Sequence, residues 1–304
     1  MNKKRVVLAG GSGFLGRSLA KKLLKKNYEV VVLTRSPRNR TDGILEAVWD
    51  GKTLGEWIQF LNGAEAVVNL TGRSVNCRHT PENLREIVES RVNSVNDLAA
   101  AIDHVSHPPR VWVQAGSLAF YGDLADEWCD ESTSSGKGEA VEICRLWENA
   151  FRNVPLQKTR CVLLRIGLVL ARHGGALSVL GKLTKWFLGG AAGNGRQYIS
   201  WIHLADMNRM WMDSIEREDL NGVFNACAPK PVTNAEFMRE MRRAMYRPWC
   251  PPAPVWAVRL GSRLMKTEPS LALTGRRCSP LHFLEKGFKF QFTELPDALA
   301  DIYG

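Results

Sequence analysis

The stretch RVVLAGGSGFLG, residues 5–16, decides the fold that we expect for this 304-residue chain. It opens with a short apolar run of the kind found in buried strands, and glycines follow at once. The pattern G-x-x-G-x-x-G begins at Gly10, and the overlapping pattern G-x-G-x-x-G begins at Gly11. Apolar residues then recur at helical spacing over residues 14–24, with lysines on the opposite face. A strand, a glycine turn and an amphipathic helix in this order predict a dinucleotide-binding turn.

Glycines suit such a turn for three physical reasons. They allow a tight reversal from strand to helix, they let the backbone approach a pyrophosphate, and they bring helix and strand together. The pyrophosphate then lies at the amino terminus of the helix, where free N–H groups and the helix dipole favour negative charge. A turn that serves packing alone is the alternative, and the flanking strand and helix argue against it.

The residues after the next expected strand, 29–33, indicate which dinucleotide would bind. An NAD site usually offers Asp or Glu there for the ribose hydroxyls. This chain offers Thr34 and Arg35, with Arg40 close behind, and a guanidinium can form two hydrogen bonds with a 2′-phosphate. The sequence therefore predicts NADP(H), the alternative being that Arg35 is only an exposed loop arginine. Asp50, after a third strand, is a candidate for contact with the adenine amino group, with a turn aspartate as the alternative.

Strands and helices alternate along the first 170 residues. Beyond residue 9, apolar runs predict further strands at 29–33, 66–70, 111–115 and 161–166. Helical spacing occupies about 82–103 and 139–152. This alternation predicts an α/β protein with a doubly wound parallel sheet, the Rossmann fold, whose dinucleotide-binding domain spans residues 1–170.

The composition shifts beyond residue 170 toward glycine-rich and proline-rich stretches. We expect a smaller domain on the substrate side, residues 171–304, with one strand near 222–227 returning to the Rossmann domain. Its tail is expected to form a short strand over GFKFQF (287–292) and then a helix.

The composition is that of a globular protein, with 45% hydrophobic and 24% charged residues. No run approaches the roughly 20 apolar residues of a membrane helix, so we expect no membrane contact. Seven scattered cysteines without a C-x-x-C pair favour a reducing cytoplasm over a disulfide framework or a zinc site. Six scattered histidines show no H-E-x-x-H pattern, so no metal site is expected.

The formal net charge of +10 raises the question of a nucleic-acid partner. The basic clusters at 21–26 and 239–247 stand at helical spacing beside apolar residues, as solvated helix faces do. No recognised binding motif accompanies the charge, so we expect no nucleic-acid partner.

Seven blocks of sequence carry a resemblance to a known family: AGGSGFLG (9–16), VNLTGRSV (68–75), AGSLAFYGD (115–123), LLRIGLVLA (163–171), GNGRQYISWIHLAD (193–206), GVFNACAP (222–229) and GFKFQF (287–292). With these blocks the chain resembles the extended short-chain dehydrogenase/reductase superfamily, of the NAD-dependent epimerase/dehydratase type. Within it, the chain is similar to an uncharacterised epimerase-like subfamily whose members are sometimes labelled cell-division inhibitors.

The resemblance implies a set of cofactor contacts. The pyrophosphate would meet Gly10, Ser12, Gly13, Phe14 and Leu15, and the 2′-phosphate would meet Arg35. The adenine-side ribose would border Leu70, Thr71 and Gly72, and the nicotinamide side would approach Ala115, Gly116 and Ser117. Arg165 joins this set because it lies near the carboxyl end of its strand, where open α/β sheets bind ligands. Ser117 also stands where the superfamily keeps a catalytic Ser or Thr, with a strand-end cap as the alternative.

The chain departs from the superfamily at the catalytic dyad. The oxidoreductases of this group use Tyr-x-x-x-Lys, in which the lysine lowers the pKa of the tyrosine. None of the five tyrosines here is followed four residues later by lysine. Alignment on Glu148 places Ala140 and Cys144 at the Tyr and Lys positions, and Arg91 replaces a helix asparagine.

Four residues are conceivable substitutes for the missing acid. We select Tyr121 as the candidate, ahead of Cys144, Tyr198 and His203. The alternatives are a core role for Cys144 and a packed structural role for His203.

The loop before His203 is the candidate substrate contact. A glycine-rich loop that carries Arg196 and Gln197 can hold phosphate or carboxylate, so we expect a small polar substrate that bears such a group. An ordinary surface hairpin is the alternative for this loop.

These patterns support two functions. The first is an NADP(H)-binding, epimerase-like oxidoreductase without the usual dyad, in which Ser117 holds a substrate oxygen. The second is a non-catalytic NADP(H) sensor or scaffold that acts through a protein partner. The resemblance also implies a homodimer.

Overall fold

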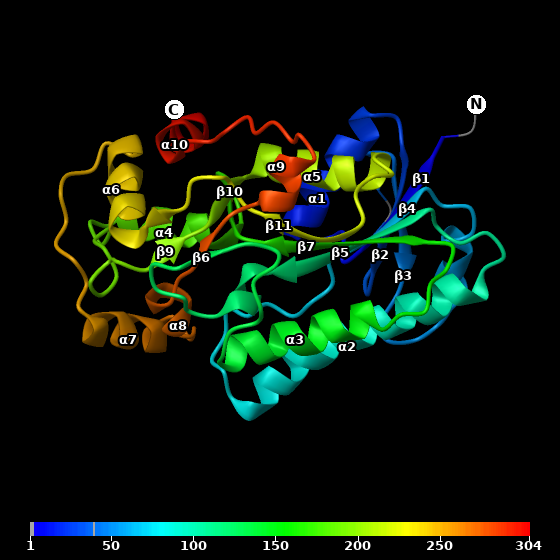
Figure 1. Cartoon of the computed structure of the whole chain (residues 1–304), viewed down its shortest axis with the longest axis horizontal. Helices are drawn as coiled ribbons and strands as arrows, with labels where there is room; N and C mark the ends of the chain where they lie inside the picture. The colour runs from blue at the N-terminus through cyan, green and yellow to red at the C-terminus, as the bar shows by residue number, and fades with distance from the viewer. Residues whose placement is uncertain (1–2, 39) are drawn as a thin grey trace.

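A seven-stranded parallel sheet forms the centre of the molecule (Figure 1). The structure, a computed structural model, describes residues 3–38 and 40–304. In sheet order the strands are β3 (Ile44–Val48), β2 (Glu29–Thr34), β1 (Arg5–Ala9), β4 (Ala66–Asn69), β5 (Val111–Ser117), β7 (Arg160–Ile166) and β11 (Gly222–Ala226). Every neighbouring pair is parallel, which confirms the predicted Rossmann fold.

Helices cover both faces of the sheet. On one face lie α2 (Pro81–His104) and α3 (Glu139–Arg152), packed along each other; on the other lie α1 (Phe14–Lys25) and α5 (Leu204–Glu216) (Figure 1). The bounds of α2 and α3 agree with the sequence expectation. The Thr80 hydroxyl caps α2 by accepting from the Asn83 amide at 3.2 Å.

The strand order reverses direction between β1 and β4, and this is where Gly10 lies. Its φ is +74°, and a Cβ there would stand 2.9 Å from the amide nitrogen of Thr71. Gly16, in the first turn of α1, packs directly on the backbone of Gly11, so a Cβ would lie 2.5 Å from the Gly11 Cα. Both positions admit only glycine without displacing the backbone.

Residues beyond β7 form a second, smaller set of elements. They include β8 (Leu168–Leu170), α4 (Gly175–Lys185), β9 (Tyr198–Ile199), β10 (Trp201–His203), β12 (Val232–Thr233), α6 (Asn234–Ala244), α7 (Val255–Leu264), α8 (Ser270–Leu273), α9 (Leu281–Glu285) and α10 (Leu295–Tyr303). A hydrophobic cluster around Trp201 and Phe237 joins α4, α6 and α10. Both α5 and β11 belong instead to the Rossmann layers, so the chain re-enters the first unit after leaving it.

Short elements join this part of the chain to the segment after β5. They are η2 (Leu118–Tyr121), β6 (Trp128–Cys129) and β13 (Arg277–Cys278). A further short helix, η1 (Glu56–Phe60), contacts β3. Because β6 pairs with β13, the thiols of Cys129 and Cys278 come within 2.7 Å of each other in a buried cluster.

The expected strand over GFKFQF is absent, and this prediction was wrong for a physical reason. The amides of Gln291 and Phe292 donate to the buried carboxylate of Asp206, each at 2.9 Å, rather than to a neighbouring strand. The segment therefore crosses α5 as an extended chain, and α10 follows as expected. Within the described residues, no helix combines the length and the apolarity needed to cross a membrane.

Gly16→Ala is expected to lower the free energy of unfolding by about 1–3 kcal/mol, because the new methyl group would press on the Gly11 backbone. Urea denaturation measures this change. Gly261→Ala in α7 is the matched control: no atom lies within 4 Å of its Cβ position, and we expect a gain of about 0.5–1 kcal/mol. Equal stability of Gly16→Ala and the unaltered chain would contradict the close helix–strand contact.

Candidate functional site

The amino terminus of α1 faces the carboxyl edge of the sheet with unused donors. Gly13 is its N-cap residue, and no side chain caps the helix. The Gly13 amide donates to the Gly10 carbonyl, and the Arg17 amide donates to the Gly13 carbonyl. The amides of Phe14 and Leu15 find no backbone acceptor among the described residues. They are therefore free to bind an anion, as the glycine pattern predicts.

The ring of Phe14 is held by a second glycine pair. A Cβ on Gly174 or Gly175 would lie 2.6 or 3.1 Å from this ring, and both glycines have positive φ. The turn that begins α4 therefore packs on the glycine loop after β1. The sequence shows these two glycines, but their contact with Phe14 depends on tertiary structure.

Arg35, directly after β2, is exposed and forms no hydrogen bond or ion pair with any described residue. Arg40 is already engaged, because its guanidinium pairs with Asp42 and with Glu46. The hydrogen bond with Arg40 lowers the pKa of Asp42 to about 2. Of these two arginines, Arg35 is the one left available for a 2′-phosphate.

Asp50 holds a turn. Its carboxylate accepts from the amides of Lys52 and Thr53 and from the Thr53 hydroxyl, each at 2.9 Å. These hydrogen bonds lower the pKa of Asp50 below its usual 3.8. The geometry favours the interpretation that Asp50 stabilises a turn. A contact between Asp50 and the adenine amino group stays a prediction.

The end of β4 provides a buried hydroxyl without a partner. The Thr71 Oγ1 atom is buried and meets no hydrogen-bonding group among the described residues. The Asn69 side chain fixes this position by accepting from the Thr71 amide at 3.0 Å. Gly72 packs on the guanidinium of Arg91, which donates to the carbonyl oxygens of Arg73 and Ile87 at 2.9 Å. A ribose hydroxyl would satisfy Thr71, so this edge fits the expected cofactor.

Ser117 ends β5, after Ala115 and Gly116, and caps η2. Its hydroxyl oxygen accepts from the Ala119 amide at 3.2 Å, and its side chain is half-buried. Because the hydroxyl proton is not used in this contact, Ser117 retains a donor for a ligand. Its capping role and its predicted substrate contact are therefore compatible.

Tyr121 lies in a buried polar network and not in an open site. Its side chain is fully buried, and its hydroxyl accepts from Arg165 at 2.7 Å and donates to Asn225 at 2.9 Å. Burial raises the pKa of Tyr121 well above its usual value of 10. This geometry argues against the predicted catalytic role, and we leave Tyr121 out of the proposed site.

Arg165 is held in the same network. Its guanidinium forms two hydrogen bonds with Glu148 of α3, at 2.9 and 2.8 Å, and stacks 3.6 Å from the Phe120 ring centre. The side chain is 2% exposed and points away from solvent. The sequence placed Arg165 near the correct strand end, but the structure gives it a packing role and not a cofactor contact.

The residues at the Tyr and Lys positions of the usual dyad do not supply acid–base chemistry. Ala140 is exposed on the first turn of α3, and Cys144 is buried one turn later. Burial, with a smaller effect of the Glu148 charge, raises the pKa of the Cys144 thiol to about 12. Cys144 is therefore a neutral core residue at pH 7.

The predicted substrate residues divide into two kinds. Arg196 is exposed and its guanidinium has no partner among the described residues. Gln197 instead donates to the carbonyl oxygens of Ala192 and Ala272, at 3.1 and 2.8 Å, and so stabilises its own loop.

His203 begins α5, and its geometry is that of a packed structural residue. Its Nδ1 atom accepts from the Ala205 amide at 3.2 Å, and its ring lies 4.0 Å from that of Phe292. Burial lowers the pKa of His203 below 6.5, although the Asp301 carboxylate acts in the opposite direction. A neutral, capping imidazole does not support the predicted substrate contact.

Arg276 is a candidate that the sequence did not reveal. It precedes β13, and its buried Nε atom has no hydrogen-bond partner among the described residues. Its charge lies close enough to Cys144 of α3 to favour the thiolate. The charge of Arg276 therefore acts, more weakly than burial, on the thiol at the helix position where the superfamily keeps its lysine. Nothing in the local sequence signals this, because residue 276 lies far from residue 144 along the chain.

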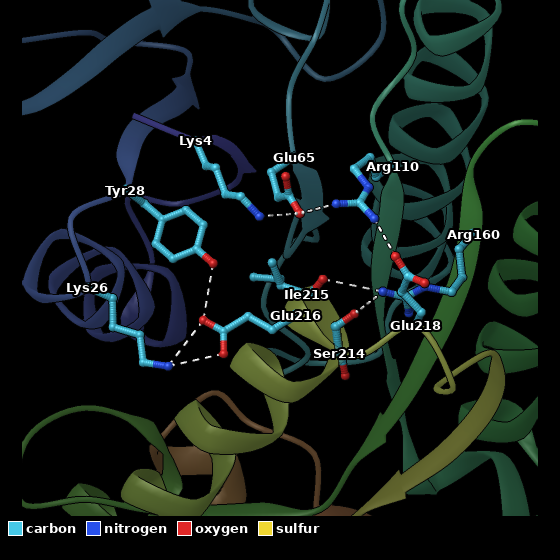
Figure 2. Close-up of polar contacts among 10 residues, drawn as sticks. All are labelled: Lys4, Lys26, Tyr28, Glu65, Arg110, Arg160, Ser214, Ile215, Glu216 and Glu218. Carbon is cyan, nitrogen blue, oxygen red and sulfur yellow. Dashed lines mark hydrogen bonds and ion pairs between the residues drawn. The ribbon is translucent and has the colours of Figure 1, made fainter. Parts of the chain in front are cut away.

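A separate cleft of about 720 Å³ lies at the opposite, amino-terminal edge of the sheet. Several of its charged residues are paired with neighbours (Figure 2). Glu65 bridges Lys4 and Arg110, each at 3.2 Å, and Glu216 accepts from Lys26 and from the Tyr28 hydroxyl at 3.1 Å. These contacts hold the starts of neighbouring strands to one another and to the end of α5. No group of three or more potential metal ligands occurs within the described residues.

Comparison with known proteins agrees with this geometry. The model of the NAD dependent epimerase/dehydratase family matches residues 6–227. The chain belongs to this family. A second model, a domain of unknown function called DUF1731, matches residues 253–302.

Members of the family from distantly related organisms align with almost the whole of this chain. The chloroplastic epimerase family protein SDR39U1 homolog of Arabidopsis thaliana is 32% identical, covering 98% of this chain and 86% of that protein. The human epimerase family protein SDR39U1 is 31% identical, covering 98% of this chain and 99% of that protein. A crystal structure of human SDR39U1 with NADPH superposes with a TM-score of 0.89 at 30% identity, covering 98% of this chain and 99% of that one.

Tyr121→Phe is expected to lower the free energy of unfolding by about 1–3 kcal/mol, because Arg165 and Asn225 each lose a buried partner. The affinity for NADPH should stay unchanged. Urea denaturation and a fluorescence titration with NADPH measure the two effects. A Tyr121→Phe variant with unaltered stability and abolished turnover would restore the catalytic interpretation.

Proposed function

We propose that this protein binds NADP(H) at the loop after β1 and acts as an epimerase-like oxidoreductase on a small anionic substrate. The observation that carries the proposal is the pairing of unused amides at the start of α1 with an unpartnered Arg35 at the end of β2. The family match and the NADPH-bound human relative support it.

The residues that would hold the cofactor follow from the geometry. Gly10, Ser12, Gly13, Phe14 and Leu15 would bind the pyrophosphate, because this backbone is accessible and carries free amides. The Thr71 hydroxyl would meet the adenine-side ribose. Thr34 and Arg35 would bind the 2′-phosphate, and a guanidinium is suited to that geometry. When bound, NADP(H) supplies or accepts a hydride at its nicotinamide ring.

The substrate side is cationic. Arg276 has a buried Nε atom without a partner among the described residues, and Arg196 is exposed on the loop before β9. Two unpaired guanidinium groups favour a substrate with a carboxylate or phosphate group. Ser117 would donate its hydroxyl proton to a substrate oxygen and hold that oxygen in place.

The missing dyad favours a second candidate function. Tyr121, Cys144 and His203 are all buried in packing roles, so none of them replaces the tyrosine as a proton donor. A protein that binds NADP(H) without turnover, and signals through a partner, would retain the same nucleotide residues. The two functions differ in whether Ser117 and Arg276 matter for turnover.

Three further expectations remain predictions. A homodimer would bury the helix pair α2–α3, where Leu146 is exposed on the outer face. Cytoplasmic location and the lack of a nucleic-acid partner rest on composition alone.

Arg35→Ala is expected to weaken NADPH binding by about 10- to 100-fold and to leave NADH binding nearly unchanged, since only the 2′-phosphate loses its partner. Titration of cofactor-free protein with both nucleotides measures the preference. Arg40→Ala is the matched control, because Arg40 is engaged by Asp42 and Glu46 and should leave the preference intact. Failure of both nucleotides to bind the unaltered chain would refute the proposed cofactor site.

NADPH oxidation should occur with carbonyl compounds or sugar nucleotides that carry a carboxylate or phosphate group. With such a substrate, Ser117→Ala should lower kcat by about 100-fold, and Arg276→Gln should raise KM by about tenfold. Steady-state kinetics separate the two effects. Tight NADPH binding without turnover across the screen would favour the sensor, and full activity of Ser117→Ala would remove its role.

A further inference from the structure

One end of the molecule carries exposed aromatic and basic side chains together. They come from residues 182–188, at the end of α4, and residues 242–266, which run from α6 through α7; we name this surface the aromatic–basic face. Figure 1 shows α6, the loop after it and α7 at the end of the molecule away from β3. Its large exposed side chains are Trp186, Phe187, Leu188, Tyr246, Trp249, Val255, Trp256, Leu260, Leu264 and Met265.

The end of α4 contacts the loop that leads into α7. The Arg247 guanidinium lies 5.3 Å from the centre of the Phe187 ring, and the Cys250 thiol donates to the Phe187 carbonyl at 3.0 Å. Ala253 extends this contact, because its amide donates to the Ala191 carbonyl at 2.8 Å. The chain enters α7 two residues later.

The side chains on this surface are too exposed to serve the fold. Trp186 is 79% exposed, Trp256 is 69% exposed and Leu264 is 77% exposed. Along α7, Trp256, Leu260 and Leu264 repeat every four residues and so share one side of the helix, with Arg259 and Arg263 beside them. Apolar surface of this extent marks an interaction site.

The charge of the aromatic–basic face has one sign. Residues 242–266 contain six arginines or lysines and no Asp or Glu, and residues 182–188 add two lysines and no acid. The pairing of Arg243 with Glu240 of α6 neutralises one of these charges. The remaining cations favour an anionic partner.

We propose that the aromatic–basic face binds the surface of a membrane that contains anionic phospholipid. Exposed tryptophan and tyrosine beside arginine and lysine match what an interfacial binding surface needs: rings that insert among headgroups and cations that meet lipid phosphates. A lipid interface accepts protruding rings without a matching pocket. A second copy of the chain is disfavoured, because a two-fold contact would place this cationic surface against itself.

This binding differs from a membrane span and is independent of NADP(H). It departs from the expectation, drawn from composition alone, that the protein meets no membrane. The reason is that ten-residue α7 is far too short to cross a bilayer, yet long enough to lie in its surface.

Sedimentation of the full chain with vesicles tests the proposal. We expect binding to vesicles of phosphatidylglycerol with phosphatidylcholine, little binding to phosphatidylcholine alone, and weaker binding at high salt. The double variant Trp186→Ala/Trp256→Ala and the double variant Arg259→Gln/Arg263→Gln should each lower the partition coefficient by about tenfold or more. Their NADPH affinity and urea midpoint should match those of the unaltered chain.

Leu45→Ala/Val48→Ala is the matched control, because these exposed side chains lie on β3 at the other end of the molecule. It should bind vesicles like the unaltered chain. No binding to anionic vesicles, or equal binding to both vesicle types, would overturn the proposal. An oligomer that the tryptophan variants dissociate, measured by light scattering, would assign the face to a second copy instead.

Discussion

The close approach of three backbone segments around Gly10 and Gly11 is the constraint on which the rest of the site depends. A side chain at Gly10 would strike the end of β4, and one at Gly16 would strike the turn itself. With these contacts in place, α1 begins directly above the point where the strand order reverses. The free amides of that helix, the Thr71 hydroxyl and Arg35 then share one edge of the sheet.

A second constraint lies under that edge. The buried ion pair between Arg165 and Glu148 joins β7 to α3, and Tyr121 and Asn225 extend it to η2 and β11. A buried pair of this kind is stable only when every polar atom is satisfied. The inner side of α3, where the superfamily keeps its lysine, is thus packed around an arginine from the sheet. The Ser117 hydroxyl and the Arg276 guanidinium keep donors for hydrogen bonds to a ligand, but an arginine stays protonated at pH 7 and supplies no acid–base chemistry.

The basic residues of the carboxyl-terminal elements form two groups. Arg276 has a buried, unsatisfied Nε atom and Arg196 is exposed on the loop before β9, whereas the arginines of α7 stand beside exposed tryptophan at the end of the molecule. The basic residues behind the net charge of +10 are therefore unevenly distributed. They are densest where the largest exposed aromatic side chains lie. This coincidence distinguishes the aromatic–basic face from the solvated basic side of α1, whose lysines have no exposed aromatic neighbours.

The sequence by itself determined the Rossmann sheet, the extents of α2 and α3, and the glycine loop, because each follows from residues that are neighbours along the chain. It also determined the absence of the Tyr-x-x-x-Lys dyad. Only the tertiary structure decided which polar residues are free. Tyr121 and Arg165 look like site residues in sequence, but residues 17 to 104 positions away in the chain satisfy their polar atoms in the fold. His203 also looks like a site residue, but it caps α5 and packs on Phe292. Arg276 becomes a candidate for the opposite reason: it precedes β13, which pairs with β6, and its buried Nε atom has no partner among the described residues.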